Sequence, residues 1–188
     1  MTLTRRDLFP LAAAAVAAGA RLSPGPAPAA APLRPAFAAA PKKAVKLGMV
    51  GVDGSLADKF VALRECGFDG VEVDAPGELS LDELRRCAEQ SGVVVHGVVD
   101  SVHWQQPLSH PDAAVRDAGR RALELAIEQA AALGATSVLL VPAVVDKQVP
   151  YLAAWQRSQA EIRRVLPLAE RLSVDILIEN VWNRFLLG

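Results

Sequence analysis

Cysteine is scarce in this sequence, and the few cysteines present lack the spacing of a metal or redox centre. The 188 residues include two cysteines, Cys66 and Cys87, and neither belongs to a CxxC or Cys/His pattern. A zinc knuckle or a redox pair is therefore not indicated. We interpret both as small buried apolar residues, and nothing in their spacing favours a disulfide between them.

Clusters of basic residues are also lacking beyond the first 43 positions. Residues 44–188 carry 14 basic and 20 acidic residues, a net charge of −6. Nucleic acids and anionic membrane surfaces bind clustered Lys and Arg, so we expect no nucleic-acid partner. A glycine-rich phosphate-binding loop is missing as well, which leaves a phosphorylated substrate without local support. A small neutral or metal-chelated substrate fits this composition better.

The apolar run near the N-terminus is too short for a membrane span. Paired arginines, Arg5 and Arg6, stand ahead of an alanine-rich run at 11–20. A stable spanning helix needs ~20 strongly apolar residues, so we expect no stable membrane span. The segment looks like a twin-arginine signal peptide, with the small-x-small pattern Ala36-Phe37-Ala38 predicting cleavage before Ala39. The alternative is a low-complexity alanine tail on a cytoplasmic protein.

This interpretation divides the chain into a signal and Pro/Ala-rich segment at 1–38 and a mature domain at 39–188. A signal of this type predicts export to the periplasm or another extracytoplasmic compartment. The twin-arginine pathway carries folded proteins, often ones that acquire a metal before crossing, which is compatible with a metalloenzyme.

From Val45 onward, short β-branched runs alternate with longer stretches of helical periodicity, a pattern typical of parallel βαβ units. Ser55 is positioned to cap the first helix, and Ser80 with Glu83 matches an S-x-x-E capping box for the second. We expect five strands, at 45–50, 70–74, 93–99, 136–141 and 174–179. Helices are expected at 55–66 and 80–90, from near 112 to 133, and along a stripe from 155 to 172. The predicted fold class is α/β with a parallel sheet.

Ligand chemistry in such folds collects at the carboxyl ends of the strands, where the βα loops converge. Glu179 ends the apolar fifth strand, where an unpartnered carboxylate would be costly to bury. A metal ion or a substrate hydroxyl would remove that cost, and so would an ion pair with a nearby Arg or Lys. Both interpretations are open at this point.

Three further residues are candidates for the mouth that these converging βα loops form, and a fourth is not. Glu72 in the second strand either points into the mouth or lines a solvated edge. His103 and Trp104 follow the third strand; the histidine can bind a substrate hydroxyl or a metal, or make only a loop hydrogen bond. His96 lies within a valine-rich strand, and we interpret it as a core residue.

Four segments together resemble the sugar phosphate isomerase/epimerase family, whose members have a xylose isomerase-like barrel. They are Gly67 to Glu72, Ser101 to Trp104, Leu133 to Ala135, and Ile178 to Asn183. The order and spacing of these segments match the family over residues 45–188. The resemblance implies a (β/α)8 TIM barrel, of which about five β/α units are present here.

The resemblance also implies a site. A divalent metal is expected at the barrel mouth, held by carboxylates and a histidine, with Glu179 as the first ligand and a candidate catalytic base. His103 is the second catalytic candidate, and Glu72 and Trp104 are candidates for binding the sugar substrate. In such enzymes the metal polarises a carbonyl while a carboxylate moves a proton on the adjacent carbon, through an enediolate. Manganese, magnesium, cobalt or zinc would suit the site.

The family's remaining ligands, an Asp, a His and a second Glu, come from strands six to eight, which we do not find before Gly188. A complete barrel needs at least ~200 residues, whereas 150 follow the predicted cleavage site. Unpaired edge strands invite association. We therefore expect a fragment of a longer protein, or a half-barrel that pairs with a complementing half or a second copy. The expected function is sugar isomerisation or epimerisation; the alternatives are a noncatalytic exported sugar-binding barrel and an inactive truncated chain.

Overall fold

The computed structural model describes residues 41–185, so the predicted signal segment and its cleavage site lie outside the described residues. Within this part of the chain, five parallel strands form one sheet in the order β1-β2-β3-β4-β5. The strands are β1 (Ala44–Lys46), β2 (Gly70–Ala75), β3 (Val94–Asp100), β4 (Ser137–Leu140) and β5 (Asp175–Ile178). This arrangement confirms the predicted α/β class and the partial barrel.

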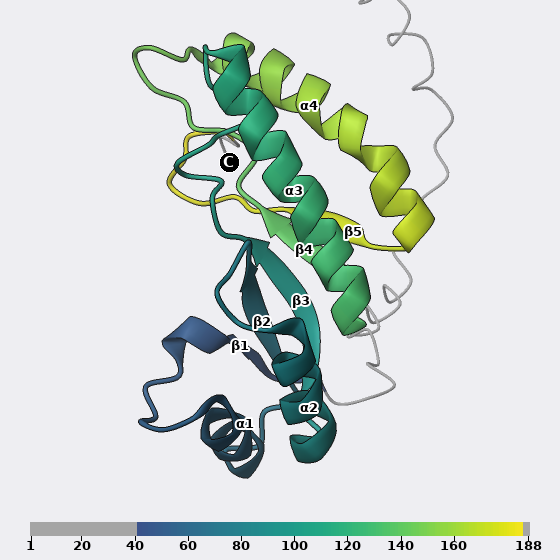
Figure 1. Cartoon of the computed structure of the whole chain (residues 1–188). Coiled ribbons are helices and arrows are strands. Elements are labelled where there is room, and N and C mark those ends of the chain that lie inside the picture. Colours follow the sequence, from purple (N-terminus) through teal and green to yellow (C-terminus); the bar gives the residue numbers. More distant parts are fainter. Residues whose placement is uncertain (1–40, 186–188) are drawn as a thin grey trace, which may run out of the picture. The chain divides into compact units, whose positions relative to one another are not determined.

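Each connection between consecutive strands carries one helix, as a parallel sheet requires. The helices are α1 (Leu56–Glu65), α2 (Leu81–Ser91), α3 (Ala113–Leu133) and α4 (Tyr151–Leu172). Figure 1 shows α1 and α2 beside the β1–β3 end of the sheet, with α3 and α4 running side by side next to β4 and β5. One face of the sheet is therefore covered by helices, as on the outside of a β/α barrel.

The helix ends show which local sequence signals operate. Ser55 caps α1 in a reciprocal capping box with Asp58, and Asp112 caps α3 by accepting the Ala114 N–H. The predicted box at Ser80 is wrong, because its side chain makes no capping hydrogen bond although the residue stands at the N-cap of α2. Ser80 is exposed, so water can satisfy the first N–H groups of that helix.

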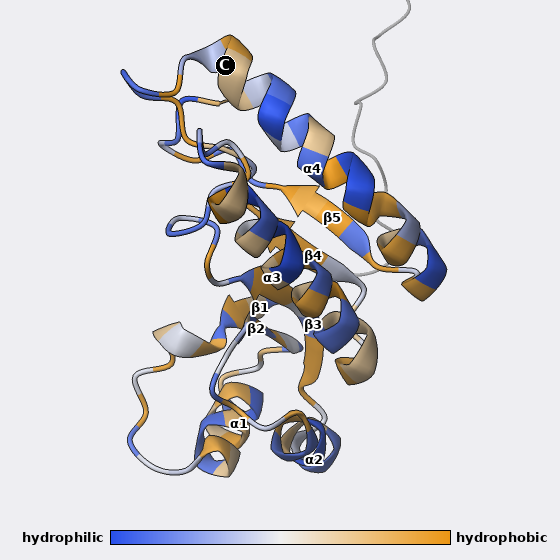
Figure 2. Cartoon of the chain, turned by 45° about the horizontal axis from the view of Figure 1, so that its top comes forward, coloured by the Kyte–Doolittle hydropathy of each residue, from blue (hydrophilic) through white to orange (hydrophobic). Residues whose placement is uncertain are grey.

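The core lies between the sheet and the helices. Alternate side chains of the central strands are fully or almost fully buried against the helices, including Val71, Val73, Val98, Val138 and Leu140. In Figure 2 the strands β4 and β5 are mainly hydrophobic, whereas the helices mix hydrophobic and hydrophilic residues. The other face of the sheet, called the inner face below, is the one that would line a barrel.

The first strand is shorter than its sequence pattern predicts. It ends at Lys46, and Leu47–Met49 form a 3-10 turn closed by a hydrogen bond from the Val50 N–H to the Leu47 carbonyl. The turn leaves Leu47 buried in the core. The chain thus bends away at the carboxyl end of β1, where the candidate site begins.

Candidate functional site

Charged side chains gather on the inner face of the sheet. Lys46 of β1 pairs with Asp74 of β2, with its Nζ 2.8 Å from Asp74 Oδ1. Glu72 lies on the same face, because side chains alternate along β2. Since β1 and β2 are neighbours, these residues are held together by the strand register rather than by a flexible loop.

His96 lies on this inner face, at a β-bulge. In the pairing of β2 with β3, Val71 is opposite Val95 and Glu72 is opposite Gly97, so His96 is the extra residue. Its Nε2 lies 3.8 Å from Glu72 Oε1. The expectation of a core histidine is therefore wrong, because His96 follows the helix-facing Val95 and its side chain points to the opposite face of the sheet. Glu72 faces the interior that a closed barrel would have, rather than a solvated edge.

Gly97 allows this close arrangement. A Cβ at that position would lie 3.2 Å from Ser137 Oγ and 3.5 Å from Glu72 Oε1. Ser137 therefore shares the inner face, and its register partner Asp175 brings the start of β5 to the same side. Four carboxylates, from Glu72, Asp74, Asp175 and Glu179, are thus directed to one side of the sheet.

Glu179 follows β5 directly, as the sequence predicts. Its N–H donates to the Leu140 carbonyl at 2.9 Å, which extends the β4–β5 ladder by one bond. Alternation from Asp175 through Leu177 puts its half-buried carboxylate on the inner face. Glu179 makes no ion pair within residues 41–185. The interpretation of Glu179 as half of an ion pair therefore has no partner within that range.

His103 is buried in the loop after β3. Its Nδ1 accepts the Val141 N–H at 3.4 Å, so the loop hydrogen bond anticipated as one alternative is present. Burial, reinforced by the charge of Lys46 and partly offset by Asp74, lowers the pKa of His103 to about 4. The ring is therefore neutral at pH 7, and with Nδ1 accepting, its proton resides on Nε2.

Sequence reasoning missed Asp100, the last residue of β3. Its side chain is 1% exposed and Oδ1 accepts the Val102 N–H at 3.2 Å. Burial raises the pKa of Asp100 to about 6, although the hydrogen bond from Val102 lowers it. The sequence signal for Asp100 was a carboxylate at the end of an apolar strand, and Glu179 has the same kind of position.

Trp182 is the second residue that sequence reasoning missed. Its ring stacks on Trp104 with centroids 5.5 Å apart and an interplanar angle of 9°. Trp104 in turn meets the His103 ring edge-on, with centroids 5.4 Å apart. The structure thus joins His103 and Trp104 to the loop that follows Glu179.

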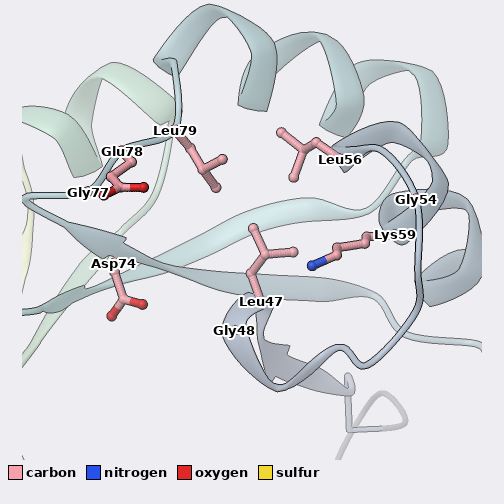
Figure 3. Close-up of a pocket in the computed structure, with 9 residues that line it drawn as sticks. All are labelled: Leu47, Gly48, Gly54, Leu56, Lys59, Asp74, Gly77, Glu78 and Leu79. Atoms are coloured by element: carbon pink, nitrogen blue, oxygen red, sulfur yellow. The ribbon is translucent and has the colours of Figure 1, made fainter.

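A pocket of about 440 Å³ opens at the carboxyl ends of β1 and β2. Figure 3 shows Leu47, Leu56 and Leu79 converging in it, with the Lys59 amine beside Leu47 and Asp74 pointing away from the leucines. The mouth therefore offers an apolar recess next to the charged inner face. Such recesses with a few polar groups are typical of small-molecule sites.

The family follows from a comparison with family models. Residues 60–188 match the model described as "Xylose isomerase-like TIM barrel". The chain belongs to the xylose isomerase-like TIM barrel family. No curated protein is significantly similar to it in sequence.

Solved structures of similar fold include several sugar epimerases. A D-psicose 3-epimerase in the presence of D-fructose is 26% identical, with a TM-score of 0.60, over 77% of this chain and 53% of that chain. The D-psicose 3-epimerase of Clostridium cellulolyticum H10 with D-tagatose is 23% identical, with a TM-score of 0.61, over 77% and 53%. A 3-keto-D-glucoside 4-epimerase from E. coli is 16% identical, with a TM-score of 0.65, over 76% and 57%. The last two show the shared barrel fold alone.

This xylose isomerase-like chain spans about half the length of the structures it matches first. The predicted metal site is represented within it by one candidate ligand, Glu179. No group of three or more His, Cys, Asp or Glu side chains suited to a metal occurs in residues 41–185. Nor does any helix in the same range combine the length and apolar character that a membrane crossing requires.

Proposed function

We propose that the whole protein is a metal-dependent sugar isomerase or epimerase that transfers a proton on the carbon next to a sugar carbonyl. The observation that carries the proposal is the half-buried Glu179 carboxylate, without an ion-pair partner in the described range, at the strand end of a family barrel. The 26% identity to a D-psicose 3-epimerase supports an unphosphorylated sugar as the substrate. The lack of a glycine-rich phosphate loop agrees with that choice.

The donor chemistry of Glu179 fits a divalent cation. An ionised carboxylate only accepts, and oxygen ligands of this kind suit manganese, magnesium, cobalt or zinc. When bound, such a cation supplies Lewis-acid polarisation of the sugar carbonyl. Glu179 is the residue of the described chain that would hold it, and the other ligands would come from β/α units that complete the barrel.

The remaining residues act on the sugar itself. Neutral His103 keeps a proton on Nε2 and can donate it to a sugar hydroxyl or carbonyl oxygen. Trp104 packs edge-on with His103 and can contact a sugar bound beside that histidine, and Glu72 extends the polar lining below the mouth. Proton transfer beside the carbonyl through an enediolate then needs a carboxylate base within reach of the carbon, a role for which Glu179 is the candidate.

A manganese titration tests the ligand role of Glu179. Manganese has a convenient signal, because bound ion enhances the relaxation of water protons. We expect the whole protein to bind Mn²⁺ and its Glu179→Gln variant to bind at least about tenfold more weakly, since an amide oxygen lacks the charge of a carboxylate.

Asp175→Asn is the matched control. Asp175 lies on the same strand and the same inner face but at the opposite end of β5, so its loss should leave the affinity unchanged. Equal Mn²⁺ affinity of the wild type and Glu179→Gln would remove Glu179 from the metal site.

A further inference from the structure

The stacked pair Trp104–Trp182, called the tryptophan platform below, bridges two strand ends that are not neighbours. Trp104 follows β3 and Trp182 follows β5, with β4 between them. The ends of β3 and β5 are therefore two strand spacings apart, roughly 9.5 Å. Stacking of the two indoles spans this gap, so the platform lies across the mouth at the carboxyl end of β4.

Each indole is anchored by a buried neighbour. His103, 6% exposed, packs edge-on against Trp104 and is tied to Val141. Asn183, 2% exposed, follows Trp182, and its side-chain amide donates to the Ala143 carbonyl at 2.9 Å. Its backbone carbonyl also accepts the Val145 N–H. The platform is therefore preorganised by two loops that are fixed to the loop after β4.

Within residues 41–185, nothing covers the outer surface of the anchored platform. Trp182 is 82% exposed and Trp104 38% exposed. An anchored, exposed aromatic surface is typical of a binding site, because its apolar area gains free energy only when something covers it. Gln105, Asn180 and Arg184 flank the two indoles in sequence and are exposed, which gives the aromatic surface a polar rim.

We propose that the tryptophan platform is a subsite for a second sugar ring, so that the ligand is a glycoside or disaccharide rather than a single sugar. Trp182 lies three residues beyond Glu179 and is 82% exposed. A pyranose presents a face of C–H groups that packs on an indole, and its hydroxyls can bond to the amides and guanidinium of the rim. The inference rests on the proposed sugar chemistry at the inner part of this mouth.

The charge of the chain favours this ligand over other planar or ring-bearing molecules. A nucleic-acid base could stack on the same surface, but residues 44–188 carry a net charge of −6 and offer no basic cluster for phosphates. A neutral sugar ring needs no counter-charge.

Fluorescence titration of the full chain with cellobiose and with glucose tests the subsite. The chain has three tryptophans, so Trp155→Phe leaves the platform as the sole indole signal. Trp155 belongs to a separate aromatic group with Tyr151 and Phe185, which a phenylalanine can maintain. No metal is added, so the result does not depend on the role of Glu179.

We expect cellobiose to change the emission and to bind at least about tenfold more tightly than glucose, because only the disaccharide reaches both positions. In the same background Trp182→Ala should abolish this preference, while Trp182→Phe should keep part of it. Equal affinities for cellobiose and glucose, or a preference that survives Trp182→Ala, would overturn the subsite. A Trp182→Ala variant that loses self-association but keeps its sugar binding would also overturn the subsite, because the platform would then be a contact between protein chains.

Discussion

Asp100 and His103 are two buried titratable side chains close together in sequence at the carboxyl end of β3. Burial favours the neutral form of both, so the pKa of Asp100 rises to about 6 and that of His103 falls to about 4. At pH 7 the histidine is neutral and the carboxylate is charged. Of the two, Asp100 is therefore the group held in the charged form that burial disfavours, and it lies next to the loop that carries the candidate site.

These shifts predict opposite pH dependences of stability. For Asp100, whose folded pKa is raised, the stabilisation is present below pH 3.8 and lost as pH rises through about 6. For His103, whose folded pKa is lowered, it is present above pH 6.5 and lost as pH falls through about 4. Each effect is about 3 kcal/mol, and between pH 6 and 4 the two oppose each other.

Single variants should separate the two effects. Urea unfolding of the full chain at pH 7, 5.5 and 4 measures the free energy of unfolding. On acidification, Asp100→Asn should lose stability more steeply than the wild type, and His103→Gln should lose it less steeply or gain it. Parallel pH profiles for all three proteins would show that neither group is shifted as described.

At the scale of elements, α3 and α4 are joined by an ion-pair network as well as by apolar packing. Glu161 of α4 is 7% exposed and lies between three guanidinium groups. Its carboxylate oxygens are 3.4 Å from Arg116, 2.8 Å from Arg164 and 3.9 Å from Arg120. Arg116 and Arg120 belong to α3, so this carboxylate ties together the helices that cover β4 and β5.

The strand β5 forms an open edge of the sheet and exposes apolar side chains. It pairs with β4 on one side and has no second partner within residues 41–185. Leu177 and Ile178 are 48% and 44% exposed. Open, apolar strand edges pair with other strands, so we expect the full chain to associate with a second copy or a complementing half of a barrel.

A charge on that edge should oppose the association. Leu177→Lys places an ammonium on the inner face of β5, a common protection of natural edge strands, and should shift the light-scattering mass toward the monomer. Leu152→Lys is the control, since Leu152 is 63% exposed on α4 and away from the edge. A wild-type chain that is already a well-folded monomer would contradict the edge-pairing account.

At the scale of the whole molecule, the alternation of strands and helices could be predicted because it is a local property. Hydrophobic runs and signals such as Ser55, Asp112 and Gly134 act over a few residues, and the structure has an element boundary at each of them. The end of β1 could not be predicted in this way. The stretch after Lys46 has the apolar character of a strand, and only the turn that buries Leu47 ends it.

The site was predictable where it follows the strand ends and not where it depends on contacts between distant residues. Glu179, His103 and Trp104 were found because each stands at or after a strand end. The stacking of Trp182 on Trp104 joins residues from different β/α units. The bulge at His96 depends on register with β2, which no local pattern in β3 encodes.

We propose above that the mouth bearing Glu179 belongs to a sugar isomerase or epimerase. Deuterium exchange tests it most directly, because proton transfer beside a carbonyl exchanges that hydrogen with solvent. The whole protein, with the β/α units that complete its barrel, would be incubated with Mn²⁺ and D-fructose in D₂O, and the sugar analysed by NMR. We expect deuterium at a carbon next to the carbonyl with the wild type and none with Glu179→Gln. Absence of deuterium with the wild type, or equal incorporation by both proteins, would contradict it.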